Sequence, residues 1–144
     1  MVSKICNHCG RLFVGKRCSC RRDKLRSAEY HNSFYDTPVW RRLSRQVRVR
    51  DFKCDRLKLY FQKYGKPSGK AGGILFAYVM MNRTGRLTVH HIVPRDDDKS
   101  LRYVEDNLIT LSSDVHEMVH NLYDTGFKEE VQSLLRQAVA SPLP

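Results

Sequence analysis

Two histidines one helical turn apart are the first chemical feature of the sequence. They are His116 and His120 in the segment HEMVH, which matches the H-E-x-x-H pattern of zinc metalloproteases. Side chains at positions i and i+4 lie on the same face of a helix, so both imidazoles can bind one metal ion. A second pair, His90 and His91, lies upstream, and Asn107 lies between the two pairs. These residue types predict hydrolysis by a metal ion and an imidazole base.

A metalloprotease would need a third zinc ligand, usually downstream of the second histidine. No histidine follows His120, and the only acidic residues after Asp124 are Glu129 and Glu130. A protease also leaves the upstream histidine pair and Asn107 without a role. The protease interpretation is therefore disfavoured, and Glu117 is interpreted as a capping or solvent-facing residue.

Local patterns place the histidines and Asn107 on a strand, a loop, a second strand and a helix. Residues 86–94 (RLTVHHIVP) are rich in β-branched side chains and end at a proline, which favours a strand. Residues 95–106 form a polar loop, and residues 107–112 (NLITLS) form the second short strand. The next helix is expected to start near Ser113 or Asp114, with a capping box between Asp114 and Glu117.

Helices are expected on both sides of this unit. Residues 37–51 show helical spacing of apolar residues, with Thr37 as the cap and Pro38 in the first position. Trp40 belongs to the apolar face and is interpreted as a core anchor. Residues 54–64 continue as a second helix, 65–73 as a flexible loop, and 74–81 as a buried strand or helix. Residues 126–139 form a last amphipathic helix, whose apolar face consists of Val131, Leu134, Leu135 and Ala138.

The chain is strongly basic, with 26 Lys and Arg against 15 Asp and Glu and a net charge of +11. Such a charge favours salt-dependent binding of a polyanion over a merely solvated surface. The candidate phosphate contacts are Arg41, Arg42 and Arg45 in the first helix and Arg95 after the histidine strand. No apolar run reaches the roughly 20 residues that span a membrane, and no signal peptide begins the chain, so we expect a cytoplasmic protein.

Four cysteines near the N-terminus have the spacing C-x2-C-x8-C-x-C: Cys6, Cys9, Cys18 and Cys20. Clustered thiolates in a reducing compartment are typical of structural zinc, so residues 1–22 are predicted to form a zinc knuckle. His8 could replace one ligand, and redox-active or unligated cysteines are the alternative. Cys54 stands alone and is interpreted as a small buried hydrophobe.

Residues 87–120 (LTVHHIVPRDDDKSLRYVEDNLITLSSDVHEMVH) resemble the HNH endonuclease family, whose ββα-metal or His-Me finger carries a histidine pair, an asparagine and a helix-borne histidine. Residues 33–54 resemble the lead-in of phage-encoded HNH proteins. The resemblance implies that His91 is the general base, that His90 and His116 bind metal, and that Asn107 fixes the loop and orients His91. His120 is a third ligand by similarity to colicin-type nucleases.

Adjacent residues of a regular strand point to opposite faces. His90 and His91 therefore serve one phosphate if the strand frays or twists at that point, with which Pro94 is consistent, and a phosphate clamped between metal and base also suits the geometry.

The sequence departs from the family in one place. Many phage HNH proteins carry two C-x-x-C pairs that hold a structural zinc around the site. Here the first pair is reduced to Cys54 and Leu57, and the second pair falls at Ser112 and Val115. We therefore expect apolar packing, rather than a second zinc ion, to hold the finger together.

Together these observations predict an α+β protein with a zinc knuckle at 1–22 and an HNH domain at 23–144, whose ββα-metal core spans about 86–123. The resemblance implies a DNA endonuclease that uses Mg²⁺, Mn²⁺, Ni²⁺ or Zn²⁺ and leaves 3′-hydroxyl and 5′-phosphate ends. It also implies phage terminase or portal partners in a bacterial host cytoplasm. A non-catalytic zinc-containing DNA-binding protein on the same scaffold is the main alternative, followed by an RNA-binding zinc protein.

Overall fold

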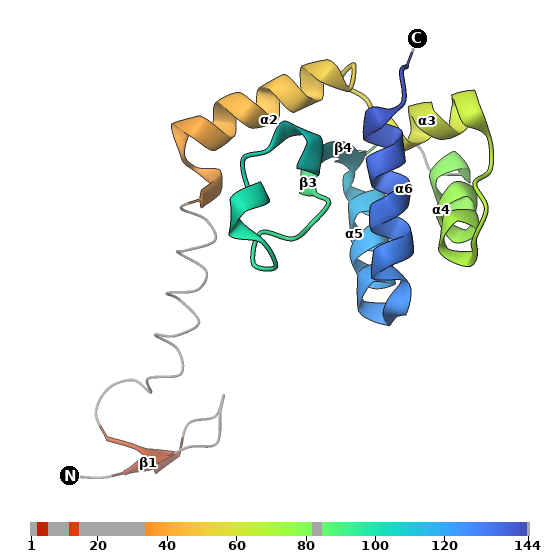
Figure 1. Ribbon diagram of the computed structural model, residues 1–144. Coiled ribbons are helices and arrows are strands. Elements are labelled where there is room, and N and C mark those ends of the chain that lie inside the picture. Colours follow the sequence, from red (N-terminus) through yellow and green to blue (C-terminus); the bar gives the residue numbers. More distant parts are fainter. Residues whose placement is uncertain (1–2, 6–11, 15–33, 82–84, 144) are drawn as a thin grey trace. The chain divides into compact units, whose positions relative to one another are not determined.

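The computed structural model describes residues 3–5, 12–14, 34–81 and 85–143 (Figure 1). The four N-terminal cysteines lie outside these residues, so the zinc knuckle stays a prediction. The chain forms two compact units, residues 1–41 and 42–144. In the first unit, β1 (Lys4–Ile5) and β2 (Leu12–Phe13) form a short antiparallel pair.

Helix α2 (Pro38–Arg50) forms where the sequence predicts it. Thr37 caps its start, because the Thr37 hydroxyl accepts a hydrogen bond from the Trp40 amide at 3.3 Å. The Trp40 side chain is buried, with its ring centroid 5.3 Å from that of Phe34 and 5.4 Å from that of Tyr35. The core-anchor interpretation of Trp40 agrees with this packing.

The centre of the second unit is an antiparallel hairpin of β3 (Leu87–His91) and β4 (Leu108–Ser112), in which His91 pairs with Leu108. Helix α5 (Ser113–Leu122) starts directly after β4 and packs against both strands. The fold is therefore α+β, with a hairpin packed against a helix, as a ββα finger requires. The connection between the strands contains two short turns, η1 (Lys99–Leu101) and η2 (Glu105–Asn107).

Three further helices pack around this hairpin and α5: α3 (Arg56–Tyr64), α4 (Lys70–Met81) and α6 (Lys128–Ala140). Between α5 and α6 the chain bends at η3 (Tyr123–Phe127), where Gly126 has a φ of 94°. The apolar face predicted for the last helix is buried, and it joins one core cluster with residues of α3, α4, α5 and the hairpin. In the described part of the chain, no helix is both long and apolar enough to cross a membrane.

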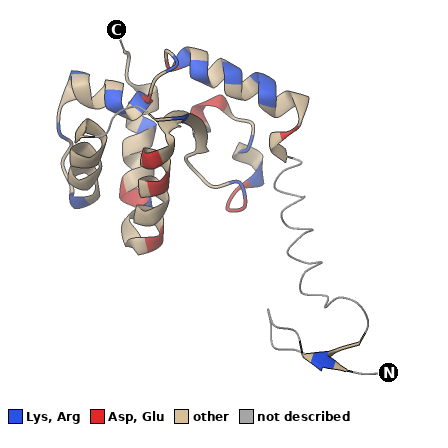
Figure 2. Ribbon diagram, turned by 180° about the vertical axis from the view of Figure 1, so that it is seen from behind, with Lys and Arg blue, Asp and Glu red and all other residues tan. Residues whose placement is uncertain are grey.

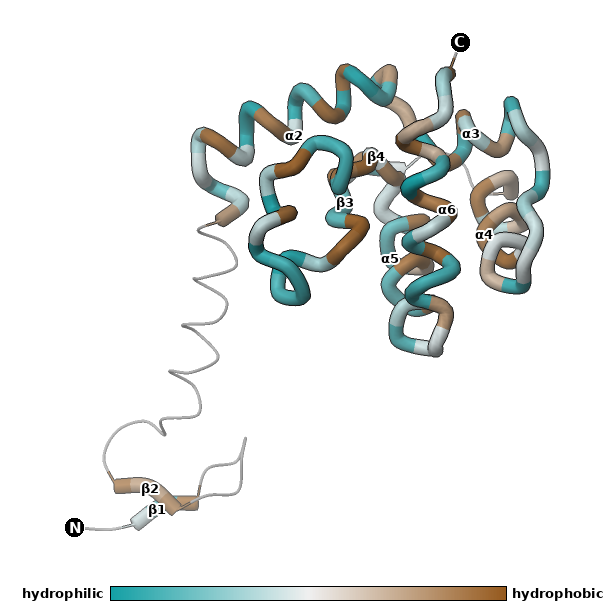
Figure 3. The backbone as a smooth tube through the Cα atoms, viewed as in Figure 1, coloured by the Kyte–Doolittle hydropathy of each residue, from teal (hydrophilic) through white to brown (hydrophobic). Residues whose placement is uncertain are grey.

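The predicted loop at 65–73 is wrong at its end, because α4 already begins at Lys70. Glu130 of α6 stabilises this first turn by accepting a hydrogen bond from the Gly72 amide at 3.1 Å. Gly69 has a φ of 97°, which favours glycine, and a Cβ atom there would displace the Glu130 carboxylate, which would lie 2.3 Å away. The interpretation of 74–81 as a buried segment holds only in part: α4 is apolar over most of its length (Figure 3), and Met81 is 84% exposed.

Helix α5 begins at Ser113, as predicted, but its cap differs from the prediction. Ser112, the last residue of β4, occupies the N-cap position without a side-chain capping hydrogen bond. The Ser113 amide donates instead to the Arg86 carbonyl at 2.7 Å, across the hairpin end. A tertiary contact thus replaces the capping box expected between Asp114 and Glu117.

Among the described residues, no second strand pairs with the outer edge of β4, and side chains bind its backbone groups instead. The Thr110 amide donates to Asp51 and the Ser112 amide donates to Asp55, both at 2.8 Å. The Leu108 carbonyl accepts from the Arg50 guanidinium at 2.7 Å. Because unpaired buried backbone groups are costly, these contacts let the hairpin sit inside the core without a third strand.

A short turn between α2 and α3 presents the two carboxylates. Phe52 and Lys53 have φ values of 59° and 52°, in the left-handed region that side chains rarely adopt. Asp51 is fully buried and is held by Arg50 and by Arg56, whose guanidinium lies 3.0 Å from the carboxylate. Arg56 also donates to carbonyls at the end of α6, so one buried ion network joins α2, α3, β4 and α6.

Apolar packing is found at the corner where the family resemblance suggested a second zinc site. Leu57 and Val115, which stand at two of the former cysteine positions, are both buried in the core cluster. Cys54 is a free thiol that is only partly buried, so its interpretation as a core residue is too strong. The next residue, Asp55, ties this corner to Ser112 instead.

Replacing Asp55 by alanine tests this edge. Asp55 accepts hydrogen bonds from the amides of Ser112 and Lys58, and both would lose their acceptor. We expect the free energy of unfolding to fall by about 2–4 kcal/mol, as for other broken buried polar contacts. Urea unfolding measures this change, and Asp96→Ala at an exposed position is the matched control. Equal stability of the two variants would contradict the role of Asp55.

Candidate metal centre and catalytic histidine

Three imidazole rings meet where β3 faces α5. His90 comes from β3 and is 2% exposed, while His116 and His120 come from successive turns of α5. The ring centroid of His90 lies 5.0 Å from that of His116 and 5.1 Å from that of His120. One nitrogen from each ring lies within 4.8 Å of the others, and the two helix histidines approach to 3.1 Å between their Nε2 atoms. The structure thus brings together the three ligands predicted from the sequence.

The backbone dictates this convergence. His90 pairs with Ile109 in the hairpin, and α5 leaves β4 without a loop, so the first turns of the helix cross the strands. Val115 and Val119 anchor the buried face of α5. His116 precedes His120 by one turn and therefore lies on the same side of the helix.

Burial keeps two of these rings uncharged. Burial first, and then the neighbouring rings of His116 and His120, lower the pKa of His90 well below its ordinary value. Burial and the nearby His120 lower the pKa of His116 to about 4. At neutral pH both rings therefore carry a free lone pair, which is the form that binds metal.

The donor set fits a divalent transition metal. Imidazole nitrogens bind such ions at about 2.0–2.1 Å, so two ligands of one ion lie up to about 4 Å apart, and the 3.1 Å pair meets this condition. The cluster found in the described residues contains three histidines and no carboxylate. Imidazole suits zinc, nickel and copper, whereas Mg²⁺ prefers oxygen ligands. Of the ions expected from the sequence, Zn²⁺ and Ni²⁺ fit best.

His91 lies apart from the cluster and faces the interstrand loop. β3 stays paired through His91, so the strand does not fray there, and the two adjacent imidazoles leave the strand in different directions. The Nε2 atom of His91 lies 3.0 Å from the Arg102 carbonyl oxygen. A carbonyl only accepts hydrogen bonds, so Nε2 carries the proton and Nδ1 carries the lone pair. Burial lowers the pKa of His91, opposed by the Arg102 carbonyl and assisted by Arg95, so the ring can act as a base.

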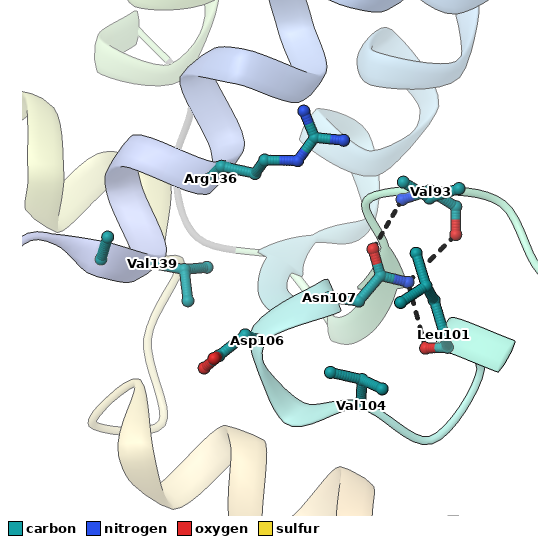
Figure 4. Close-up of a pocket in the computed structure, with 8 residues that line it drawn as sticks. Val93, Leu101, Val104, Asp106, Asn107, Arg136 and Val139 are labelled. Atoms are coloured by element: carbon teal, nitrogen blue, oxygen red, sulfur yellow. Dashed lines mark hydrogen bonds between the residues drawn. The ribbon is translucent and has the colours of Figure 1, made fainter. Parts of the chain in front are cut away.

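Asn107 closes the loop between the strands (Figure 4). Its side-chain oxygen accepts from the Val93 amide at 2.9 Å, and its side-chain nitrogen donates to the carbonyls of Val93 and Leu101 at 3.1 and 3.2 Å. Its own carbonyl accepts from the Ile92 amide at 2.8 Å. Arg102, which holds His91, follows Leu101 directly. Asn107 therefore fixes the loop whose carbonyl orients His91, and the hydrogen bonds that the structure gives for Asn107 do not include one to His91.

The predicted phosphate contacts fall into two groups. Arg95 is 9% exposed and lies close enough to His91 to affect its pKa, so it belongs to the histidine site. Arg41, Arg42 and Arg45 are exposed on α2, and Arg41 lies 3.7 Å from Asp36.

Sequence reasoning missed two residues of the site. The Arg102 carbonyl acts through its backbone, which no residue pattern reveals. Tyr123 lies against His90, with its hydroxyl 3.4 Å from the His90 Nε2 atom, and burial raises the pKa of its phenol. Its position seven residues after His116 places it on the same helix face, and this spacing was a usable signal.

The pH dependence of stability tests the uncharged rings. In the unfolded chain histidine takes up a proton near pH 6.5, whereas folded His116 does so only near pH 4. The metal-free protein should therefore lose stability as the pH falls from 6.5 towards 4, because the unfolded state binds more protons. Urea unfolding at pH 7 and pH 5 measures how much the free energy of unfolding falls between the two pH values. This fall should be smaller in His116→Gln than in the wild type by about 1–2 kcal/mol. Identical losses in both proteins would contradict the pKa of His116.

Comparison with known protein families agrees with this geometry. Residues 81–122 match the family model described as HNH endonuclease. No curated protein and no solved structure matches the chain. The matched residues contain the hairpin, Asn107 and all of α5, and therefore all four histidines of the site. The match implies nuclease activity and a nucleic-acid substrate. Residues 81–122 are an HNH endonuclease domain.

Proposed function

We propose that this protein is an endonuclease that hydrolyses DNA phosphodiester bonds with the help of a divalent metal ion. The proposal rests on the positions of the four histidines of the HNH domain. Three rings converge as a ligand set, while the fourth, His91, lies outside that set and is held through its Nε2 atom by the Arg102 carbonyl. A scaffold that only bound DNA would need neither arrangement.

His91 supplies the base. Its Nδ1 atom accepts a proton from water as the water oxygen attacks phosphorus, which makes the water a better nucleophile. The ring then carries two protons, and the Arg102 carbonyl stabilises the new charge through the hydrogen bond at Nε2. Asn107 keeps this carbonyl in place by closing the loop. The lowered pKa of His91 keeps the ring unprotonated at neutral pH before the reaction.

The metal would be held by His90, His116 and His120. A bound divalent ion would act as a Lewis acid on the phosphate and would stabilise the leaving oxygen. The three nitrogen donors favour Zn²⁺ or Ni²⁺ over Mg²⁺. Arg95, which lies near enough to His91 to lower its pKa, would contact the same phosphate through its guanidinium. Resemblance to the family supports 3′-hydroxyl and 5′-phosphate products.

The exposed arginines of α2 would bind the phosphate backbone. Basic residues, all of them arginines, recur along α2 (Figure 2), and Arg42 and Arg45 lie one turn apart on its exposed surface. Arg48 extends the same row and is partly buried. Such contacts bind without sequence preference and weaken with salt.

The biological role and the N-terminal zinc site are also part of the proposal. The resemblance of residues 33–54 to the lead-in of phage HNH proteins supports a role in phage DNA packaging, with terminase or portal partners, in the cytoplasm of a bacterial host. The four N-terminal cysteines support a structural zinc at residues 1–22, with the nuclease domain following at 23–144.

Plasmid cleavage by point variants tests the assigned roles. His91→Ala should lower cleavage by about 10²–10⁴-fold and keep metal binding, because only the base is lost. His116→Ala should lose both cleavage and tight metal binding. Glu117→Ala is the matched control, because Glu117 is exposed on the same helix and has no role in the nuclease. A large loss of cleavage in Glu117→Ala would point to the protease-type use of this helix.

Cleavage should require Zn²⁺, Ni²⁺ or Mn²⁺ and should stop in EDTA. DNA binding without cleavage in every metal would overturn the nuclease proposal and favour the non-catalytic DNA-binding alternative.

The salt dependence of DNA binding tests the α2 arginines. Arg42→Gln and Arg45→Gln should each reduce the slope of log affinity against log salt by about 1, because one phosphate contact is lost. Lys63→Gln on α3 removes the same charge elsewhere and should leave the slope unchanged. Fluorescence anisotropy with a duplex between 50 and 200 mM salt measures the slopes. Equal slopes for all three variants would exclude α2 from the interface.

A further inference from the structure

We propose that Tyr123 is a positioning residue for the metal centre, because its hydroxyl fixes the tautomer and orientation of His90. The inference rests on the proposed three-histidine site and adds a residue that lies outside that ligand set. Tyr123 follows the last residue of α5, at the start of the bend η3, and is 9% exposed. Its ring centroid lies 5.7 Å from that of His90 and 6.1 Å from that of His120.

The Tyr123 hydroxyl lies between two partners. It donates to the Ile92 carbonyl oxygen at 2.7 Å, and it lies 3.4 Å from the His90 Nε2 atom. A phenol has one proton, and a carbonyl can only accept, so this proton is committed to Ile92. Towards His90 the phenolic oxygen can therefore only accept a hydrogen bond.

The tautomer of His90 follows from this. A neutral imidazole carries one proton, and the contact with Tyr123 places it on Nε2. The lone pair is then on Nδ1, which becomes the donor atom for the metal. Because His90 is 2% exposed, no bulk water replaces the hydroxyl as an acceptor. Outer-shell hydrogen bonds of this kind orient metal-binding histidines in proteins generally.

A second donor to the Ile92 carbonyl allows the effect of Tyr123 on His90 to be separated from its effect on Ile92. Gln132 of α6 also donates to the Ile92 carbonyl, through Nε2 at 3.2 Å. The carbonyl therefore keeps one partner when the other is removed. The hydrogen bond of Gln132 goes to Ile92 and not to His90, so Gln132→Met removes a donor to Ile92 without changing the acceptor beside His90.

The test compares the full-length wild type, Tyr123→Phe and Gln132→Met. Long-range ¹H–¹⁵N NMR of the metal-free proteins at pH 7 reports which nitrogen of His90 carries the proton, with a His90→Gln variant to assign the signal. Titration calorimetry with Zn²⁺ or Ni²⁺ then measures metal affinity. We expect the Nε2–H form in the wild type and in Gln132→Met. Tyr123→Phe should show a mixture of tautomers and a metal affinity lower by about 10–100-fold.

Three results decide the proposal. An Nδ1–H form of His90 in the wild type, or an unchanged tautomer and affinity in Tyr123→Phe, overturns it. Equal losses of affinity in both variants also overturn it, because Tyr123 would then act only by holding Ile92. A wild type that binds neither ion contradicts the proposed metal centre instead, while the NMR result still decides the role of Tyr123.

Discussion

The crowding of imidazole rings beside β3 is the constraint on which the site depends. His90 is almost fully buried, and a positive charge on it would have no solvent and no carboxylate in the cluster to stabilise it. The ring therefore stays neutral, and the lowered pKa of His116 has the same cause. A buried neutral imidazole beside two others is a costly arrangement in an apoprotein, and it becomes favourable when one cation accepts the lone pairs.

The position of the hairpin that carries His90 depends on hydrogen bonds to the backbone groups along its outer edge. Asp51 and Asp55 accept from the amides of β4, and Arg50 donates to its first carbonyl. At the corner where the resemblance to phage HNH proteins suggested a second zinc site, buried carboxylates and the packing of Leu57 hold the chain together. This corner contains a left-handed turn between α2 and α3. The loss of the second zinc is thus compatible with an ordered site.

Regular spacing explains why so much of the fold could be predicted from the sequence. The i, i+4 spacing of His116 and His120 and the strand pattern around His90 follow from local backbone geometry. Contacts between distant segments could not be predicted. Glu130 extends α4 into a glycine-rich stretch, the Arg86 carbonyl replaces a capping box, and the Arg102 carbonyl holds His91. Each depends on a backbone group or on a partner far away in the sequence.

Proton release during metal binding tests the central claim most directly. At pH 6.0 an ordinary histidine with a pKa of about 6.5 is roughly three-quarters protonated, so three such ligands would release about two protons to the buffer. The account predicts that Zn²⁺ binds with one ion per chain and releases fewer than about one proton, because His90 and His116 are already neutral. Calorimetry in buffers of different ionisation enthalpy measures this number. Release of two or more protons, or no binding, would contradict a preformed neutral three-histidine site.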